Sequence, residues 1–409
     1  MNTIAILGYG TVGSGIVKVL NQNRINIEKQ AGGPVIVKKV LDKRNFSEEL
    51  GCIYTQDINE IINDNEIQII AEVMGGIDPA YEYVKRALLC GKHVLTSNKE
   101  LVTVHGAELL SIAEERNINF MFEASVGGGI PIVRPLNLAL TSDEITAVSG
   151  ILNGTSNYIL TQMCNFGKSY EEALKGAQDL GYAEKDPAAD VSGYDACRKL
   201  AILLSLATGL QVGYDQILTE GIKNITQADF KFASAFGYNL KHMVDGRIST
   251  DGVNAVVAPM LVRFSSPLSA VCDVYNAVMI QAKAAGDIMF YGPGAGKLPT
   301  AAAMISDIVD ISKHLNRHIV FKWSRENAKI LNPENYAARK LVRINTNEQD
   351  IPQGVQSLQF IKLNEYPSCA AWITEVETEA ETREKLNGIK TESILRIYDT
   401  SIKPEVKLL

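Results

Sequence analysis

A glycine-rich turn near the start of the chain restricts the fold more than any other stretch of the sequence. The apolar run 3–7 is typical of a buried strand, and it leads into the pattern G-x-G-x-x-G at 8–13. In a strand–turn–helix unit, Gly8 permits the tight turn, Gly10 lets the backbone approach a pyrophosphate, and Gly13 permits close helix–strand packing. An amphipathic helix follows, so the stretch predicts a dinucleotide site at a helix N-terminus. A tight turn with a purely structural purpose is the alternative.

Strands and helices alternate over the next hundred residues. We expect strands at 35–41, 67–73, 93–96 and 119–123, and helices at 80–89 and 107–116. This alternation predicts a Rossmann-type doubly wound parallel sheet, in which ligands bind at the carboxyl ends of the strands. Ser97 and Lys99 follow one such end. Lys99 is placed to reach a nicotinamide or a substrate, and a surface lysine beside Glu100 is the alternative.

Three charged residues follow the second expected strand. Asp42 is placed to accept a hydrogen bond from the ribose 2′-hydroxyl of NAD, whereas Lys43 and Arg44 are placed to bind the 2′-phosphate of NADP. The sequence offers both possibilities, and a solvated turn is the alternative to either.

The stretch 181–206 joins an acidic loop, with Glu184, to a buried helix. Asp195 and Lys199 are four residues apart and therefore project from one face of that helix, which continues as an apolar run. A lysine that faces an aspartate at the mouth of a buried helix is suited to acid–base chemistry. The alternatives are an ordinary helix ion pair, or a capping box between Ser192 and Asp195.

Three further turns are candidates for binding. Glu123 precedes the glycine run 127–129, where oxygens could collect around a hard cation, although a hinge between domains is the more ordinary interpretation. The polar turn 153–157, which contains Thr155, could bind a small polar molecule or cap a helix. A second glycine-rich loop at 292–300 opens the apolar helix 301–311 and is another candidate anion site.

Composition excludes several classes of protein. The chain has 409 residues, 46% of them hydrophobic, so we expect a globular protein of two or three domains. A net charge of −7 with mixed signs argues against nucleic acid as a partner. Six scattered cysteines without metal spacing suit a reducing cytoplasm. We find neither a signal peptide nor an apolar run long enough to span a membrane, and expect a cytoplasmic protein.

The last part of the chain changes in character. It is polar, with short strands expected at 339–344, 359–363, 370–376 and 394–397 and a helix at 379–386. This pattern predicts a small α+β appendage. No residue in it suggests chemistry.

The motifs, taken together and in order, resemble those of homoserine dehydrogenase over residues 1 to about 320. The matching stretches are GYGTVGSG, SNKELV, EASVGGGIPI, GILNGTSNYIL, GYAEKDPAADVSGYDACRKLAIL and GPGAGKLPTAA. The resemblance implies a Rossmann domain at 1–140, completed by about 290–320. It also implies a substrate-binding and dimerisation domain with a mixed sheet at 141–289, and a C-terminal ACT-like domain at 325–409. The implied reaction is the reversible NADPH- or NADH-dependent reduction of L-aspartate 4-semialdehyde to L-homoserine, in the pathway to threonine, methionine and isoleucine. A homodimer or homotetramer is expected.

The resemblance also implies roles for individual residues. Lys99 and Lys199 resemble the two active-site lysines of the family. The substrate pocket is expected to include Glu184, Asp195, Gly181, Tyr182 and Thr155. Cofactor contacts are expected at Gly8, Gly10, Thr11, Val12, Gly13, Lys43, Arg44, Ser97, Lys99 and Gly296. A structural sodium ion is expected at Glu123 with main-chain oxygens of Val126, Gly128 and Ile130.

The C-terminal part departs from the family pattern. The usual D-x-P-G-V-L turn of an ACT domain is replaced by residues 345–354, which makes threonine inhibition doubtful. Three alternatives remain. The chain could be another oxidoreductase on the same plan, or a non-catalytic NAD(P)-sensing protein, and its C-terminal part could be a protein-interaction module.

Overall fold

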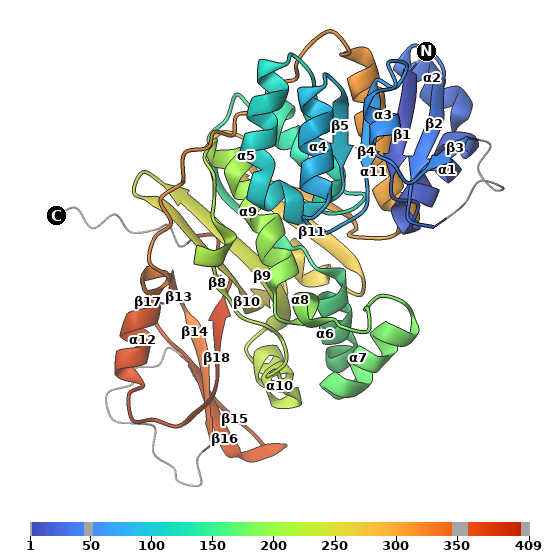
Figure 1. Ribbon diagram of the computed structural model, residues 1–409. Coiled ribbons are helices and arrows are strands. Elements are labelled where there is room, and N and C mark those ends of the chain that lie inside the picture. Colours follow the sequence, from blue (N-terminus) through green and yellow to red (C-terminus); the bar gives the residue numbers. More distant parts are fainter. Residues whose placement is uncertain (1, 45–51, 346–358, 402–409) are drawn as a thin grey trace. The chain divides into compact units, whose positions relative to one another are not determined.

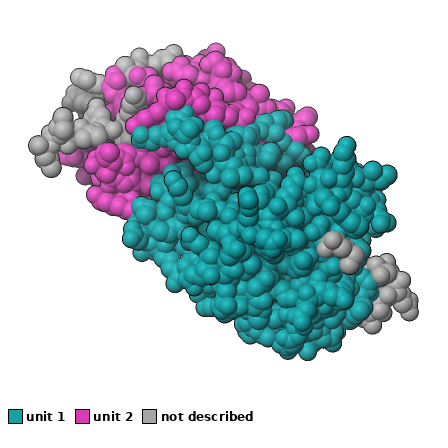
Figure 2. Space-filling view, turned by 90° about the horizontal axis from the view of Figure 1, so that it is seen from above, with its two compact units in different colours: residues 1–144, 201–213, 290–328 teal, residues 145–200, 214–289, 329–409 magenta. Residues whose placement is uncertain are grey.

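The computed structural model describes residues 2–44, 52–345 and 359–401, and the chain divides into two compact units (Figure 1). Figure 2 colours them separately. Unit 1 comprises Met1–Glu144, Ala201–Gly213 and Phe290–Ala328, and unit 2 comprises Ile145–Leu200, Tyr214–Met289 and Lys329–Leu409. The third segment of unit 1 overlaps the range 290–320, and the residues after 328 are part of unit 2. The expected domain bounds stay a prediction.

The centre of unit 1 is a six-stranded sheet in the order β3-β2-β1-β4-β5-β6, and all its strand pairs are parallel. The strands are β1 (Asn2–Leu7), β2 (Val35–Leu41), β3 (Ile53–Thr55), β4 (Ile69–Glu72), β5 (His93–Thr96) and β6 (Phe120–Met121). The order reverses between β1 and β4, which is the topological switch point of a doubly wound fold. The predicted Rossmann-type sheet is confirmed.

Six helices of the described chain belong to unit 1. They are α1 (Thr11–Gln22), α2 (Arg24–Ala31), α3 (Asn59–Ile62), α4 (Ala80–Leu89), α5 (Lys99–Glu115) and α11 (Lys297–Lys313); short turns occur at η1 (Glu123–Ser125) and η2 (Pro135–Ala139). In α1 the buried face includes Ile16, Val19 and Leu20, at the spacing of one helical stripe. Helix α5 begins at Lys99, earlier than the predicted 107, because the Asn98 side chain accepts a hydrogen bond from Leu101 N at 3.2 Å.

Unit 2 contains a large mixed sheet in the order β12-β11-β7-β9-β10-β18-β14-β16-β15, with β8 also pairing with β10. Its strands are β7 (Ile145–Ile151), β8 (Leu218–Thr219), β9 (Tyr238–Ser249), β10 (Gly252–Arg263), β11 (Tyr275–Ala282), β12 (Gly286–Pro293), β14 (Lys340–Asn345), β15 (Gln359–Leu363), β16 (Tyr366–Ile373) and β18 (Thr391–Ile397). A separate pair joins β13 (Ala337–Ala338) to β17 (Glu377–Thr378). The predicted mixed sheet is therefore confirmed.

The helices of unit 2 precede and follow the strands of this sheet. They are α6 (Gly154–Phe166), α7 (Tyr170–Asp179), α8 (Ala188–Val191), α9 (Tyr194–Thr208, which ends in unit 1), α10 (Gln227–Ala235) and α12 (Glu379–Lys385), with short turns at η3 (Tyr214–Gln216), η4 (Pro267–Ala270) and η5 (Pro333–Asn335). Gly181 has a φ of +74° directly after the C-cap of α7, so it ends this helix as predicted.

The C-terminal segment shares the core of unit 2. Its strands β14, β15, β16 and β18 and helix α12 occur close to the predicted positions. Leu341, Ala371 and Ile373 pack in one apolar cluster with Phe232 and Leu261. Burial in a common core explains why the segment belongs to unit 2. Its ACT-like character stays a prediction, because most of the diagnostic turn at 345–354 lies outside the described residues.

Within the described ranges, no helix combines the length and the apolarity that crossing a membrane requires.

Candidate active site

The glycine turn between β1 and α1 has the geometry of a phosphate-binding loop. Gly8 has a φ of +99°, which favours glycine. A Cβ atom at Gly13 would lie 2.1 Å from the carbonyl oxygen of Gly8, so α1 can approach the strand this closely only with glycine there. Gly10 occupies the N-cap position, is exposed, and has open space where a Cβ would be. The amides of the first turn of α1, at Thr11 and Val12, therefore face a position that a pyrophosphate can occupy.

The second glycine-rich loop opens α11 beside this turn. Gly296 has a φ of +122° and is the N-cap of α11. A Cβ atom at Gly15 would lie 2.7 Å from the carbonyl oxygen of Lys297, so α1 and α11 cross at van der Waals contact through a glycine. Both helices belong to unit 1. The predicted cofactor residue Gly296 thus lies where the start of α11 meets α1.

Asp42 and Arg44 form a hydrogen-bonded pair at the carboxyl end of β2. Asp42 Oδ2 accepts from Tyr9 N at 2.7 Å, and Asp42 Oδ1 accepts from Arg44 N at 3.0 Å and from Arg44 Nε at 3.1 Å. Partial burial raises the pKa of the Asp42 carboxyl, but the hydrogen bonds from Arg44 and Tyr9 outweigh burial and bring this pKa down to about 2. Lys43 and Arg44 are exposed. The described structure therefore offers an anion and two cations where the adenosine ribose of a Rossmann ligand is bound.

Lys99 follows the carboxyl end of β5, as the sequence predicted. It is the first residue of α5, one residue after the cap Asn98 and two after Ser97. Beneath it, Thr96 donates a hydrogen bond to the fully buried carboxylate of Glu72, which also accepts from Met74 N at 2.7 Å. Burial raises the pKa of Glu72, and these hydrogen bonds act against that rise. Sequence reasoning missed Glu72, since it lies within the expected apolar strand 67–73.

In unit 2, a buried cluster surrounds Lys199. The ammonium Nζ donates to Asp195 Oδ2 at 2.7 Å and to the carbonyl oxygen of Leu152 at 2.9 Å. Lys199 is 9% exposed and Asp195 3% exposed. The Asn153 amide Nδ2 donates to Asp195 Oδ2 at 2.8 Å and to Asp190 Oδ1 at 2.7 Å. The helix face predicted from the four-residue spacing is therefore confirmed, and it presents a charged pair to a polar, desolvated site.

The start of α9 does not place Ser192 at the position expected for a capping box. Helix α9 begins at Tyr194, so Gly193 rather than Ser192 is the residue before it. The Ser192 hydroxyl instead donates to the carbonyl oxygen of Ala188. The carboxylate of Asp195 accepts hydrogen bonds from Lys199 and from Asn153.

The loop after α7 carries the other predicted substrate residues. Thr155 Oγ1 donates to the carbonyl oxygen of Tyr182 at 2.7 Å, which ties the start of α6 to this loop. Gly181, Tyr182 and Glu184 are all exposed. Among the residues that the structure describes, no hydrogen bond connects the Glu184 carboxylate with the Lys199 cluster. Its place as a substrate contact stays a prediction.

Glu123 is buried, and its carboxylate binds backbone amides. Oε1 accepts from Ile132 N at 2.6 Å and Val133 N at 2.9 Å, and Oε2 accepts from Arg134 N at 2.8 Å. These bonds leave the carboxylate little capacity for a cation, so the side chain does not fit the ligand role considered from sequence chemistry. The described part of the chain also holds no group of three or more His, Cys, Asp or Glu arranged for a metal ion. A cation at this turn would depend on main-chain oxygens.

The glycine run after Glu123 lets its backbone lie close to the backbone of the second glycine-rich loop. Gly127 and Gly128 have φ values of +70° and +57°. A Cβ atom at Gly128 would lie 2.6 Å from the carbonyl oxygen of Gly294, and Gly129 N donates to Pro293 O at 3.2 Å. The run therefore joins η1 to the second glycine loop within unit 1.

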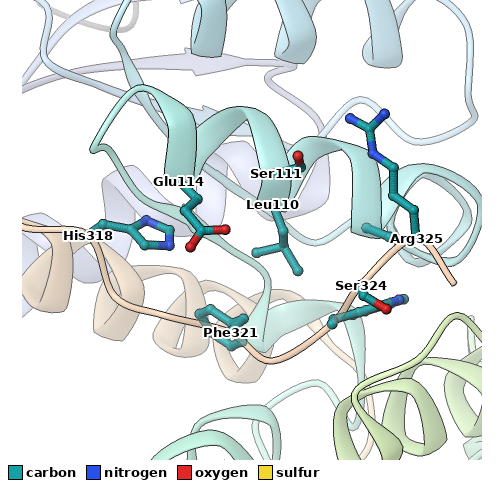
Figure 3. A pocket seen from close by; sticks show the side chains of 9 residues that line it. Leu110, Ser111, Glu114, His318, Phe321, Ser324 and Arg325 are labelled. Carbon is teal, nitrogen blue, oxygen red and sulfur yellow. The ribbon is translucent and has the colours of Figure 1, made fainter.

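A separate cavity of about 240 Å³ lies between α5 and the segment that follows α11 (Figure 3). Figure 3 shows Glu114 and Leu110 on one wall and His318, Phe321 and Arg325 on the other. None of the residues predicted for cofactor, substrate or metal lines it.

Comparisons with known proteins match most of the chain to one family. Residues 8–123 match the family model described as the NAD binding domain of homoserine dehydrogenase, and residues 131–309 match the one described as homoserine dehydrogenase. The chain is 39% identical over 353 residues to the homoserine dehydrogenase of Bacillus subtilis, covering 85% of this chain and 82% of that one. It is 41% identical over 332 residues to that of Lactococcus lactis, covering 80% and 78%.

This chain belongs to the homoserine dehydrogenase family. Solved structures agree with this assignment. A homoserine dehydrogenase from Thiobacillus denitrificans superposes with a TM-score of 0.91 at 31% identity, covering 97% of this chain and 98% of that one. One from Staphylococcus aureus superposes with a TM-score of 0.79 at 32% identity, covering 97% and 98%. A hyperthermophilic archaeal member, solved in complex with NADPH, superposes with a TM-score of 0.64 at 25% identity, covering 76% and 98%.

Proposed function

We propose that this protein catalyses the reversible reduction of L-aspartate 4-semialdehyde to L-homoserine with a nicotinamide nucleotide. Family membership supports the reaction type. The observation that carries the proposal is the buried Lys199, whose ammonium is oriented by Asp195 and by the Leu152 carbonyl oxygen. A dehydrogenase for an alcohol–aldehyde pair needs a proton donor and acceptor at the reacting oxygen, and a fixed lysine can supply both.

The nucleotide fits unit 1. The open Gly10 position, the close packing at Gly13 and the N-terminus of α1 suit a pyrophosphate, and Asp42, Lys43 and Arg44 suit the ribose end. When bound, the nucleotide supplies or accepts the hydride. The phosphorylated and unphosphorylated forms are both compatible with these residues.

Side chains of this chain are proposed to transfer the proton and to bind the substrate. In reduction, Lys199 donates a proton to the oxygen that develops alkoxide character; in oxidation, the neutral amine takes the hydroxyl proton. Asp195 and Glu184 are proposed to bind the substrate ammonium, and Lys99 to orient the substrate. The two acids favour a substrate that bears an amino group.

A comparison of two alcohols tests this assignment. L-homoserine and 4-hydroxybutanoate share the reacting hydroxyl and the carboxylate, and only the first has an amino group. We expect NAD(P) reduction with homoserine and a decrease in kcat/KM of at least ~10²-fold with 4-hydroxybutanoate, since Asp195 and Glu184 would lose the cation that they bind. Equal rates with both alcohols would contradict the proposed role of the acids.

A structural cation is a further proposal for unit 1. It would be held by main-chain oxygens at the turn formed by Glu123, Val126, Gly128 and Ile130, since the Glu123 carboxylate binds three amides. Thermal unfolding in sodium and in a bulky organic cation at equal ionic strength is the test. A higher Tm in sodium supports the site, and an equal Tm argues against it.

The assembly and its setting are proposed from the family resemblance. We propose a homodimer or larger homo-oligomer that works in the cytoplasm, in the pathway to threonine, methionine and isoleucine. Light scattering of the purified protein measures its mass in solution, and fractionation of cells locates it.

A further inference from the structure

Asn153 uses both ends of its side-chain amide. It lies between the end of β7 at Ile151 and the start of α6 at Gly154. Its Oδ1 accepts from Ser156 N at 2.7 Å and so caps α6. Its Nδ2 donates to Asp190 Oδ1 at 2.7 Å and to Asp195 Oδ2 at 2.8 Å. One side chain, 4% exposed, therefore connects a helix start with two carboxylates.

The two carboxylates need this donor. Both contact the same nitrogen, so they lie close together, and like charges repel strongly where burial reduces solvent screening. The amide N–H₂ group is neutral and has two N–H donors, so it can bridge the two carboxylates without adding a charge. Asp195 cannot turn away from Asp190 without breaking a hydrogen bond. The hydrogen bond from Asn153 therefore helps to fix the orientation of Asp195.

The same carboxylate oxygen also fixes the lysine. An ammonium has three N–H donors, and the described contacts of Lys199 use two of them, to Asp195 Oδ2 and to Leu152 O. When the amine is neutral, its two N–H groups can keep these same acceptors. Its lone pair then occupies the third direction, which is where a substrate hydroxyl must approach. Leu152 directly precedes Asn153. This short segment therefore provides one acceptor of Lys199, the Leu152 carbonyl oxygen, and holds the other, the Asp195 carboxylate, through Asn153.

We propose that Asn153 is a positioning residue for the acid–base step, which holds Asp190 and Asp195 in the arrangement that directs the third N–H or the lone pair of Lys199 at the reacting oxygen. This inference rests on the proposed function. It predicts that Asn153 acts mainly on kcat and on its pH dependence, whereas a residue needed only for folding would alter the amount of active protein.

Two substitutions test the amide nitrogen of Asn153 separately from its capping oxygen. Asn153→Asp has the same size and keeps a capping oxygen for Ser156 N, but replaces the donor with a third carboxylate. Asn153→Ser also keeps a capping oxygen, but it lacks the amide N–H₂ group that donates to both carboxylates, and it adds no charge. Thr378→Ala is the matched control, because Thr378 caps α12 with its hydroxyl and contacts none of the proposed active-site residues.

We expect both Asn153 variants to lose at least ~10-fold in kcat for homoserine oxidation, with NADP and NAD binding by fluorescence titration unchanged. In Asn153→Asp, the added anion stabilises the ammonium form of Lys199, so the pH profile of oxidation moves to higher pH. Asn153→Ser should lower the rate without that movement. Thr378→Ala should lower Tm and leave kcat unchanged.

The proposal is overturned if both variants keep the kcat and pH profile of the unsubstituted protein. It is also overturned if their loss of activity is matched by an equal loss of folded protein in circular dichroism, since Asn153 would then act only as a cap. Failure of the proposed function is a different result, because the unsubstituted protein would then show no homoserine-dependent reduction of either nucleotide.

Discussion

Lys199 Nζ lies 2.7 Å from Asp195 Oδ2, one turn apart on α9, and both side chains are buried. A surface pair at this spacing contributes little to stability, but a buried pair must be compensated on every side to persist. Here the Leu152 carbonyl oxygen and the Asn153 amide provide the compensation. Burial of two charged groups carries a desolvation penalty, so stability alone does not account for this pair. A buried lysine with fixed acceptors suits a group that exchanges protons.

Removal of the lysine should abolish most of the turnover. We expect Lys199→Ala to lower kcat by at least ~10²-fold in both directions, the scale of lost general acid–base catalysis. Steady-state assays of homoserine oxidation measure this, with Lys231→Ala as a control because Lys231 is an exposed lysine of α10 that pairs with Glu365. Near-normal turnover in Lys199→Ala would remove the lysine from this role.

Two glycines of the first turn should respond differently to a methyl group. At Gly13 a Cβ would meet the Gly8 carbonyl oxygen at 2.1 Å, so Gly13→Ala should lower the Tm of the nucleotide-free protein by several degrees. At Gly10 the space is open, so Gly10→Ala should leave that Tm unchanged while weakening nucleotide binding ~10-fold or more. Calorimetric titration and thermal unfolding measure both. Tight nucleotide binding by Gly10→Ala would show that the pyrophosphate lies elsewhere.

Arg44 should govern the choice between the two nucleotides. Its guanidinium hydrogen-bonds the Asp42 carboxylate and is exposed to solvent. We expect Arg44→Ala to raise the KM for NADP about tenfold relative to that for NAD, since a charge-assisted hydrogen bond to a 2′-phosphate contributes about 1.5–3 kcal/mol. Lys43→Ala in parallel identifies which cation is responsible. Equal changes in both KM values for both variants would exclude this pair from phosphate recognition.

Protein stability should fall in mild acid because of a buried histidine. His242 hydrogen-bonds Glu220 O through Nε2 and Ser156 Oγ through Nδ1, and burial lowers its pKa to about 4. The unfolded chain takes up this proton near pH 6.5, so the contribution of His242 is fully present above pH 6.5 and is lost as the pH falls towards 4, by roughly 3 kcal/mol at most. The Tm of His242→Gln should therefore depend less on pH between 7 and 5. An unchanged dependence would mean that His242 does not titrate in this range.

The sequence predicted the parallel sheet and the Asp195–Lys199 face because both follow from local periodicity. The alternation of apolar strands with helices is enough to predict a parallel sheet, and the helical repeat places residues that are four apart on one side of α9. The order of the strands in the sheet was not predicted. Asn153 could be assigned only to a polar turn, because its partner Asp195 is 42 residues away and comes close through the packing of α6, α8 and α9. For the same reason, the sequence could not show that the amides of residues 132–134 donate to the Glu123 carboxylate.

The central claim is tested most directly by following the reduction of NADP and NAD by L-homoserine in parallel at alkaline pH, with and without threonine. The account predicts homoserine-dependent reduction of at least one nucleotide, with formation of L-aspartate 4-semialdehyde in equal amount. A protein that is folded and binds the nucleotide, yet reduces neither NADP nor NAD with homoserine, would contradict it.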